Sequence, residues 1–477
     1  MVGQVFQPAG SGDFRVPGTR ADTNVRETGS QECLPCFGPS RPAVLTRLQS
    51  DPPAAGGCKG RFPSGGGWAM VGGRKRQGSA TRTQVMNPLT AQLMGTPRAM
   101  PRIPVANARL ADVLDRHTRP ADLWRAESGK VRCLACGHRC LLAEGRRGIC
   151  KVRFNRDGAL QAPYGYVAGL AADPVEKKPF FHLLPGNDAL TFGMLGCDFH
   201  CAYCQNWLTS QALRDEQAGG HIRAATPEQL VATAQRAGAR LVVSSYNEPL
   251  ITAEWAVAVF RPAREAGLLC AMVSNGNATP EALDYVQPWI EAFKVDLKTF
   301  QDAHYRRLGG TLANVTRTIA AAHQRGLWLE VVTLLVPGFN DSREELRDMA
   351  AFLAGVSPDI PWHVTAFHPD YRMTGPRATG VTDLLNAVEI GMRAGLHFVY
   401  AGNLSGRVEE WENTRCPGCG GTLIVRHGFQ VLSCRLDAGG RCPDCQREIP
   451  GLWGDGTPMP GQSHWWNRLP RPVRLAD

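Results

Sequence analysis

The sequence contains no run of about 18 apolar residues, which is the length that an α-helix needs to cross a membrane. It also lacks a compact apolar segment behind a basic start, so no secretory signal is evident near residue 1. From these two absences we expect a cytoplasmic protein without a membrane-spanning segment. The length of 477 residues suggests about two to four domains.

The net charge is small outside the first hundred residues. Residues 1–100 hold 12 Lys and Arg against 5 Asp and Glu, which accounts for +7 of the formal net charge of +10. The remainder of the chain is therefore close to neutral, and the high overall pI says little about its folded part. A basic tail could touch nucleic acid, but we expect no nucleic-acid partner for the folded part.

Residues 1–105 lack the periodicity of a helix or a strand. They are rich in Gly, Pro, Arg and Ser, as in "SGDFRVPGTR" and "DPPAAGGCKG". Such a composition cannot bury enough apolar surface to offset the entropy of ordering. We therefore expect a disordered tail here, and we assign no role to its cysteines.

Cysteine, in contrast, is abundant, with 16 in the chain, most of them in tight C-x2-C and C-x3-C pairs. In a chain without an export signal, such pairs favour metal binding over disulfides. A first module is expected at 106–165, opening on the helix-like stretch 109–127. Its four thiols could close a tetrahedral zinc site, which we favour slightly, or bind an auxiliary iron–sulfur cluster; they are Cys133, Cys136, Cys140 and Cys150.

A second set of four cysteines lies in the final segment, 406–477. Two C-x2-C pairs stand in the turn-like sequences "CPGCGG" and "CPDCQ", and "TLIVRHGFQVLSC" between them has the pattern of a hairpin. This arrangement predicts a zinc ribbon, in which Cys434 is spare. The expected ligands are Cys416, Cys419, Cys442 and Cys445.

The region 166–405 alternates short apolar runs with amphipathic stretches that open on Thr or Ser. Strand and helix in turn predict an α/β fold with a buried parallel sheet. The repeat of about 30 residues favours a partial (β/α) barrel of the TIM type, with a doubly wound open sheet as the alternative. The expected strands lie within 189–196, 240–246, 268–275, 292–298, 327–337, 362–367 and 396–403.

The stretch "GCDFHCAYCQNW" directly follows the first expected strand. It supplies Cys197, Cys201 and Cys204, spaced C-x3-C-x2-C, and lacks the fourth ligand of a closed zinc site. Three thiolates on a four-iron cluster leave one iron open. A zinc knuckle completed by His200 or a distant residue is the alternative. It is disfavoured because the motif lies at the end of a strand, where chemistry sits in barrel folds.

This spacing, with an aromatic residue at Tyr203 before the last cysteine, resembles the motif of the radical S-adenosylmethionine (SAM) superfamily. The resemblance implies that Cys197, Cys201 and Cys204 hold a [4Fe–4S] cluster whose open iron is chelated by SAM. It implies reductive cleavage of SAM to methionine and a 5′-deoxyadenosyl radical, which abstracts hydrogen from a substrate that the sequence does not identify. It also implies an electron donor such as flavodoxin or ferredoxin.

Later strand ends resemble the SAM-binding segments of the same superfamily. "SSYNEP" carries the Glu-Pro of a Gly-Gly-Glu-Pro motif, with Tyr246 and Asn247 in place of the glycines. "VSNGN" resembles a T-N-G strand end, and "KVDLK" resembles a D-x-K strand. We expect Tyr371, Arg372 and Met373 to line the substrate pocket. The residues expected around the cofactor are Tyr203, Glu248, Asn275, Asp296, Lys298 and His368.

More narrowly, residues 121–453 resemble the radical SAM member of the AmmeMemoRadiSam system. The stretches "VRCLACGHRC", "YNEPLI", "LLVPGFND" and "YAGN" carry the likeness, with Gly137 where relatives usually have Pro. The resemblance implies Memo-like and AMMECR-type partner proteins. Two alternatives stay open: a glycyl-radical activating enzyme, and a non-enzymatic protein that binds zinc and nucleic acid.

Overall fold

The computed structural model describes residues 110–219, 221–454 and 471–476. The expected disordered tail, 1–105, lies outside these residues. Within the described part of the chain, no helix combines the length and the apolar character needed to cross a membrane.

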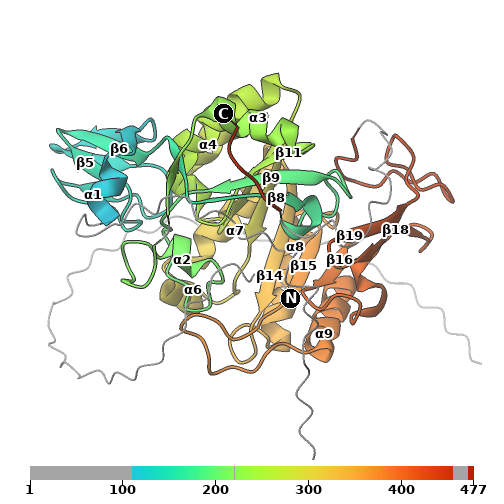
Figure 1. The fold of residues 1–477 in the computed structure, drawn as a ribbon. Coiled ribbons are helices and arrows are strands. Elements are labelled where there is room, and N and C mark those ends of the chain that lie inside the picture. The colour runs from blue at the N-terminus through green and yellow to red at the C-terminus, as the bar shows by residue number, and fades with distance from the viewer. Residues whose placement is uncertain (1–109, 220, 455–470, 477) are drawn as a thin grey trace, which may run out of the picture. The chain divides into compact units, whose positions relative to one another are not determined.

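A nine-stranded sheet organises this part of the chain (Figure 1). Its order is β16-β15-β14-β13-β12-β11-β9-β8-β20, so the parallel strands follow one another in chain order. A doubly wound sheet would reverse its order at a switch point, so that alternative is wrong. The edges are β16 and β20, and the described sheet is open and does not close into a barrel.

The expected α/β class is confirmed, because each expected apolar run contains one parallel strand. The antiparallel strands β8 (Gly169–Pro174) and β20 (Arg471–Pro472) extend one edge. The parallel strands are β9 (Asp188–Gly193), β11 (Leu241–Ser244), β12 (Leu269–Ser274), β13 (Ala292–Asp296), β14 (Trp328–Leu335), β15 (Trp362–Ala366) and β16 (Val399–Gly402).

Helices connect the parallel strands, and hydroxyl caps mark where several of them begin. The side chains of Thr226, Thr279, Thr311 and Ser342 each accept a hydrogen bond from the backbone three residues on. The helices are α2 (Trp207–Ser210), α3 (Pro227–Arg236), α4 (Ala253–Glu265), α5 (Pro280–Val286), α6 (Asp302–Leu308), α7 (Leu312–Gln324), α8 (Arg343–Val356) and α9 (Val381–Arg393), with short 3-10 turns at Val175–Lys177, Pro249–Thr252, Gln287–Trp289 and Glu409–Glu412.

The two faces of the sheet bury different groups, because side chains alternate along a strand. Val242 and Met272 belong to the main apolar core, which includes the helices. Val243 and Ala271, one position away, pack instead with the segment 175–184 on the opposite face. Further along this second face the side chains become polar, with Lys294 paired in register with Glu330. The apolar face thus fixes the helices and leaves the other face available for chemistry.

The N-terminal module contains α1 (Leu110–Asp115) and two small antiparallel sheets. The expectation of a helix over 109–127 is wrong beyond Asp115, because Pro120 cannot donate a helical hydrogen bond and Thr118–Pro120 pairs with β6. A buried ion pair attaches the module to α4, with both guanidinium nitrogens of Arg153 on Glu254 at 2.7 and 2.8 Å. The strands are β1 (Thr118–Pro120), β2 (Trp124–Glu127), β3 (Lys130–Cys133), β4 (Leu141–Leu142), β5 (Phe154–Arg156) and β6 (Ala159–Pro163), and a separate ribbon pairs β7 (Tyr166–Val167) with β10 (Arg223–Ala224).

The C-terminal module is a three-stranded antiparallel sheet of β17 (Thr414–Arg415), β18 (Thr422–His427) and β19 (Gln430–Cys434). The expected hairpin is confirmed as β18 and β19. Arg426 docks the module, because its guanidinium donates to the Phe181 carbonyl at 2.6 Å and lies 4.2 Å from the centre of that ring. Beyond the module, β20 returns to the edge of the main sheet beside β8.

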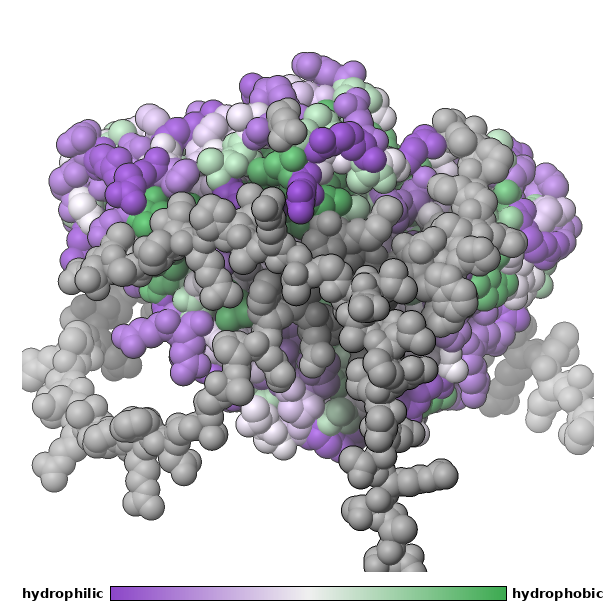
Figure 2. All heavy atoms as spheres, viewed as in Figure 1, coloured by the Kyte–Doolittle hydropathy of each residue, from purple (hydrophilic) through white to green (hydrophobic). Residues whose placement is uncertain are grey.

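Hydrophilic residues cover most of the surface visible in Figure 2 outside the grey atoms. Large apolar side chains are exposed at a few described positions. Two of these, Leu141 and Ile149, lie in the N-terminal cysteine module and are 38% and 39% exposed. The others are Met392 and Leu432.

Candidate active site

The loop that carries Cys197, Cys201 and Cys204 begins directly after β9. It turns at Gly196, whose φ of 96° suits glycine, and a Cβ there would meet the Val152 side chain at 2.8 Å. The backbone N–H of Phe199 donates to the Cys197 sulfur at 3.4 Å, and the hydroxyl of Ser210 lies 3.2 Å from the Cys204 sulfur. The loop therefore presents its sulfurs to polar groups at the carboxyl end of the sheet.

Cys201 is buried, and the other two thiols of the loop, Cys197 and Cys204, are half-buried. Cys201 is 7% exposed, and burial raises its pKa to about 12 against the opposing charge of Lys298. Burial also raises the pKa of Cys197 and of Cys204. Free thiols in such a place stay protonated near neutral pH, so iron binding would release their protons.

Glu248 follows β11 and is 2% exposed. Its carboxylate accepts hydrogen bonds from the Asn275 backbone at 2.8 Å and from the Ser274 hydroxyl at 2.7 Å. Burial and the nearby charge of Asp198 nevertheless raise the pKa of Glu248 to about 8. The sequence placed Glu248 and Asn275 near one site, and the structure brings them together.

Asp198 and Asn277 are site residues that the sequence analysis missed. Asp198 is fully buried, and its two oxygens accept hydrogen bonds from the side-chain amides of Asn275 at 2.7 Å and Asn277 at 2.8 Å. The Asn275 amide also lies 3.9 Å from the Cys197 sulfur. The available signal was the pair of asparagines flanking Gly276, because positions two apart at a strand end can face the same way.

A cationic group lies on β13 and just beyond it. Asp296 pairs with Lys294 and, at 3.1 Å, with Lys298. Burial alone would raise the pKa of Asp296, but the two lysines lower it to about 2. Burial alone would lower the pKa of Lys298, but Asp296, Cys201 and Tyr203 raise it well above its usual value. Lys298 is thus a fixed positive charge near the cysteine loop.

Tyr246 replaces a glycine of the Gly-Gly-Glu-Pro pattern and keeps a backbone conformation that favours glycine, with φ at 70°. Its ring occupies the space beside Gly169 and Gly193, where an added Cβ would meet ring atoms at 2.9 and 3.1 Å. Its hydroxyl donates to Asp173 at 2.9 Å. The strained backbone is therefore held by packing and by this hydrogen bond.

The loop after β15 reaches back to the cysteine loop. The backbone N–H of Arg372 donates to the Ala202 carbonyl at 2.9 Å, and the Tyr371 ring stacks on Trp207 with centroids 4.9 Å apart. His368 is exposed, with Nε2 3.1 Å from the Gln205 amide. His368, Tyr371 and Arg372 therefore all contact residues of the cysteine motif or the turn beyond it.

Two other polar residues of the late strands have local roles. His363 is buried, and its Nε2 lies 2.6 Å from Glu330 on the neighbouring strand. Asn403 donates to the Ala366 carbonyl at 3.2 Å. Among the hydrogen bonds and ion pairs of the described residues, none joins either residue to the cysteine loop.

The N-terminal cysteines lie close to the same strand ends. The backbone of Cys136 forms an isolated antiparallel β-bridge with Ala278, and the Gly137 N–H donates to the Asn277 carbonyl at 2.8 Å. A proline at position 137 would have no N–H to donate, and even a Cβ there would meet the Asn277 and Asn314 side chains at 2.4 and 2.5 Å. These contacts favour glycine over proline at position 137.

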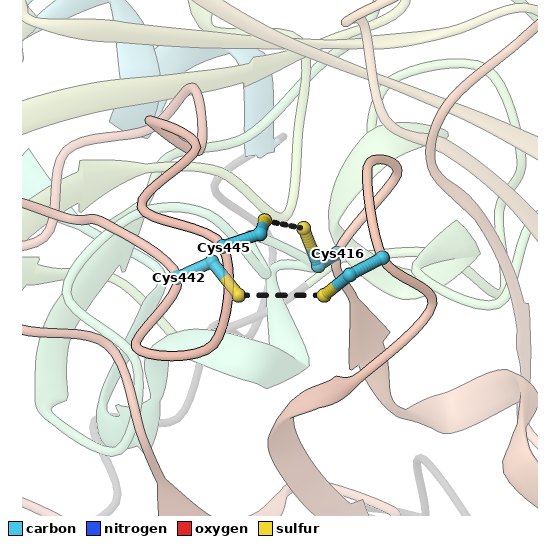
Figure 3. A group of neighbouring side chains, drawn as sticks. Cys416, Cys442 and Cys445 are labelled. Atoms are coloured by element: carbon cyan, nitrogen blue, oxygen red, sulfur yellow. Dashed lines mark hydrogen bonds between the residues drawn. The ribbon is translucent and has the colours of Figure 1, made fainter.

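The C-terminal cysteines form a compact group (Figure 3). Cys416 and Cys445 have sulfurs 3.5 Å apart, and Cys419 and Cys442 have sulfurs 3.7 Å apart. All four ligand atoms lie within 4.8 Å of one another. This is the size expected around one tetrahedral ion, because Zn–S bonds are about 2.3 Å long.

The loop after β9 has a different geometry and suits a larger group. Across the described residues, the C-terminal set is the one group of metal-ligating side chains whose ligand atoms all meet within 4.8 Å. Cys197, Cys201 and Cys204 therefore do not surround a single ion with His200, whose ring packs against Gly309. Three thiols on one loop, with Cys201 buried and the other two half-buried, fit a [4Fe–4S] cluster that keeps one iron open.

Comparisons with known proteins agree with this geometry. The family model of the radical SAM superfamily matches residues 192–353. The chain is 36% identical over 328 residues to the uncharacterized protein MJ0808 of Methanocaldococcus jannaschii, covering 68% of this chain and 96% of the relative. A further similarity is to the isethionate sulfite-lyase activating enzyme of Oleidesulfovibrio alaskensis, 25% identical over 134 residues, covering 27% of this chain and 43% of that protein.

Matches to solved structures were also found. A radical SAM methyltransferase from Sphaerobacter thermophilus matches with a TM-score of 0.37 and 18% identity, covering 50% of this chain and 71% of that one. A domain of a pyruvate-formate lyase-activating enzyme from Bacteroides vulgatus matches with a TM-score of 0.31 and 18% identity, covering 34% of this chain and 98% of that one.

The chain belongs to the radical SAM superfamily. It is an enzyme of that superfamily, whose members use a [4Fe–4S] cluster and SAM. This membership sets aside the non-enzymatic alternative as a description of the whole chain.

Proposed function

We propose that this protein is a cytoplasmic radical SAM enzyme of the AmmeMemoRadiSam type. In this proposal Cys197, Cys201 and Cys204 hold the cluster. When bound and reduced by one electron from a donor protein, the cluster would supply the electron that cleaves SAM to methionine and a 5′-deoxyadenosyl radical able to abstract hydrogen from a substrate. The open sheet corresponds to a partial (β/α) barrel, and the C-terminal module corresponds to a zinc ribbon.

The observation that carries the proposal is a pair of buried carboxylates beside the cysteine loop. Glu248 is 2% exposed and Asp198 is fully buried, and among the described residues neither forms an ion pair. Ionising both carboxyl groups in a protein interior without a cation is costly, and burial with the nearby charge of Asp198 accordingly raises the pKa of Glu248 to about 8. A ligand that carries an ammonium group would relieve this cost, and the amino group of SAM is such a group.

Other side chains suit the rest of the same ligand. Lys298 is a half-buried cation close enough to Cys201 to oppose the rise in that thiol's pKa, and it would attract a carboxylate. Asn275 links the Glu248 carboxylate to Asp198 and so fixes the orientation of both groups. The loop with Tyr371, Arg372 and Met373 reaches the cysteine loop from the other side and would border the substrate.

The proposal is tested by assaying SAM cleavage. Protein reconstituted anaerobically with iron and sulfide and reduced with dithionite should release 5′-deoxyadenosine and methionine in equal amounts, as measured by mass spectrometry. A Cys201→Ala variant should release neither product. A Cys434→Ala variant is the matched control, because this exposed thiol is outside every proposed ligand set. Equal product from Cys201→Ala and the control would refute the proposal.

A glycyl-radical activating enzyme is the second candidate, and the similarity to the isethionate sulfite-lyase activating enzyme favours it. The two candidates differ in the protein partner that they require. Neighbouring genes for a Memo-like and an AMMECR-type protein would support the first candidate. A neighbouring gene for a glycyl-radical enzyme would support the second.

A further inference from the structure

We infer that the four cysteines of the N-terminal module hold a second iron–sulfur cluster, adjacent to the radical site, and not a zinc ion. The inference concerns Cys133, Cys136, Cys140 and Cys150. Whether these cysteines bind a cluster does not depend on the proposed function. The further role of that cluster, passing electrons to the radical site, rests on the proposed function.

The sulfurs of the N-terminal cysteine set are more widely spaced than those of the C-terminal set. The described chain contains two sets of four cysteines. In the C-terminal set, all four sulfurs lie within 4.8 Å of one another. No three of the N-terminal sulfurs meet that condition, although all four residues are described and three of them are buried. A cluster places iron and sulfide between its ligands and needs wider spacing than one ion at about 2.3 Å from each sulfur.

The N-terminal module is attached to the rest of the fold by an apolar core and a buried ion pair, so it does not need a structural metal ion for this. Structural zinc typically stabilises small folds that lack a sufficient core. Here Cys133, Cys136 and Cys150 are 5–6% exposed and belong to the same apolar core as Cys201. The buried bidentate pair of Arg153 and Glu254 attaches the module to α4 without any metal.

The two cysteine loops are joined by the side chain of one residue, Arg214. Arg214 bridges them, because one guanidinium nitrogen donates to the Phe199 carbonyl at 2.6 Å and the other to the Ile149 carbonyl at 2.5 Å. Phe199 lies between Cys197 and Cys201, and Ile149 precedes Cys150. A single side chain thus fixes the position of one loop relative to the other.

A second bridge runs through Asn277. Its backbone carbonyl accepts from the Gly137 N–H at 2.8 Å, and its side chain donates to Asp198 at 2.8 Å. Gly137 follows Cys136, and Asp198 follows Cys197. Asn277 therefore links two residues, each of which directly follows a cysteine of a different set.

A redox group at this position suits single-electron relay. In that role a low-potential donor protein of the ferredoxin or flavodoxin class loses one electron and the module cluster gains it. The module cluster then returns to its oxidised state as the radical site is reduced by one electron. No covalent bond forms or breaks and no proton is needed.

The test uses the full chain with the radical motif removed, as a Cys197→Ser, Cys201→Ser, Cys204→Ser triple variant. After anaerobic reconstitution we expect about four irons and four sulfides per chain, together with about one zinc at the C-terminal set. The dithionite-reduced protein should give an electron paramagnetic resonance signal that SAM does not alter. Retention of about two zincs without iron, or of neither metal in the module, would overturn the inference.

A second variant keeps the inference testable if the triple variant fails to fold. Cys136→Ser should lower the iron content from about eight to about four per chain and keep a SAM-responsive signal. Cys434→Ser is the control and should keep about eight. An unchanged iron content in Cys136→Ser would contradict the inference. The triple variant could hold iron while the signal of the wild type does not change when SAM is added. That result would contradict the proposed function and would still support a cluster in the N-terminal module.

Whether the module cluster lies close to the radical-site cluster can be measured separately, by microwave-power saturation of the radical-site signal. Two neighbouring paramagnetic clusters speed each other's spin relaxation, so the radical-site signal should saturate at higher microwave power in the wild type than in Cys136→Ser. Equal saturation behaviour in the two proteins would contradict the relay.

Discussion

The side-chain amide of Asn275 donates a hydrogen bond to Asp198 at 2.7 Å. Through its backbone N–H, the same residue also donates to Glu248 at 2.8 Å. One residue at the end of β12 therefore holds two buried carboxylates that come from two other strand ends. The position of both carboxylates that a ligand would meet here therefore depends on Asn275.

Replacing Asn275 with alanine should weaken SAM binding. The substitution removes the bond to Asp198 and leaves that buried acceptor with one fewer donor, a change worth about 1–3 kcal/mol. We expect the dissociation constant for SAM to rise about tenfold or more, as measured by anaerobic calorimetry on cluster-loaded protein. Asn187→Ala, at the amino end of β9, is the control and should bind as the wild type does. Unchanged affinity in Asn275→Ala would contradict this role.

Restoring the family's glycine at position 246 should destabilise the protein. Glycine relieves the strained φ of 70°, worth about 1 kcal/mol, but it also removes an aromatic ring packed beside Gly169 and Gly193. Burial of such a ring contributes about 1.5–3 kcal/mol, so Tyr246→Gly should lower the melting temperature. Tyr246→Phe keeps the ring and loses only the bond to Asp173, so its melting temperature should lie between the other two. A Tyr246→Gly protein as stable as the wild type would contradict this account.

Acid should loosen the packing around His182. Its Nε2 lies 2.6 Å from the Tyr400 hydroxyl and its Nδ1 lies 2.7 Å from the Pro450 carbonyl, and burial lowers its pKa to about 4. An unfolded histidine has a pKa of about 6.5, so between these values the unfolded state binds the extra proton. The stability that neutral His182 contributes is therefore complete above about pH 6.5 and is lost as the pH falls towards 4.

This prediction is checked by urea unfolding at several pH values. His182→Gln should reduce the pH dependence of the unfolding free energy between pH 4 and 6.5 by up to about 1.4 kcal/mol per pH unit. His323→Gln, at an exposed position near the end of α7, should leave that dependence as it is in the wild type. Identical curves for His182→Gln and the wild type would show that His182 does not titrate in this way.

Removing one C-terminal thiol should release a zinc ion and unfold the C-terminal module. Cys416 is buried in the small core with Leu423 and Ile424, and four thiolates on zinc contribute folding free energy directly. Cys416→Ser should lose about one zinc per chain and become sensitive to protease between β17 and β19. Cys434→Ser should keep its zinc, because Cys434 lies outside the compact group. Retained zinc in Cys416→Ser would disprove the ribbon.

The periodic parts of the fold were predictable from the sequence. Each apolar run between residues 189 and 403 became one parallel strand, because strands buried on both faces need continuous apolar residues. Hydroxyl caps such as Thr279 and Ser342 likewise marked where helices begin. The helix expected over 109–127 failed because long-range pairing of Thr118–Pro120 with β6 outweighed local composition.

The site was predictable only where a motif repeats a family pattern. Cysteine spacing pointed to Cys197, Cys201 and Cys204, and strand ends pointed to Glu248 and Asn275. Asp198 escaped notice because its role depends on Asn275 and Asn277, which lie 77 and 79 positions away in the chain. The bridge of Arg214 between the two cysteine loops could not be read from the sequence for the same reason.

The most direct test of the central claim is an electron paramagnetic resonance spectrum of anaerobically reconstituted, dithionite-reduced protein, recorded with and without SAM. The account predicts a reduced four-iron signal that shifts when SAM is added and is absent from a Cys201→Ala variant. A spectrum without any cluster signal, from protein whose cysteine sets are filled with zinc, would contradict it.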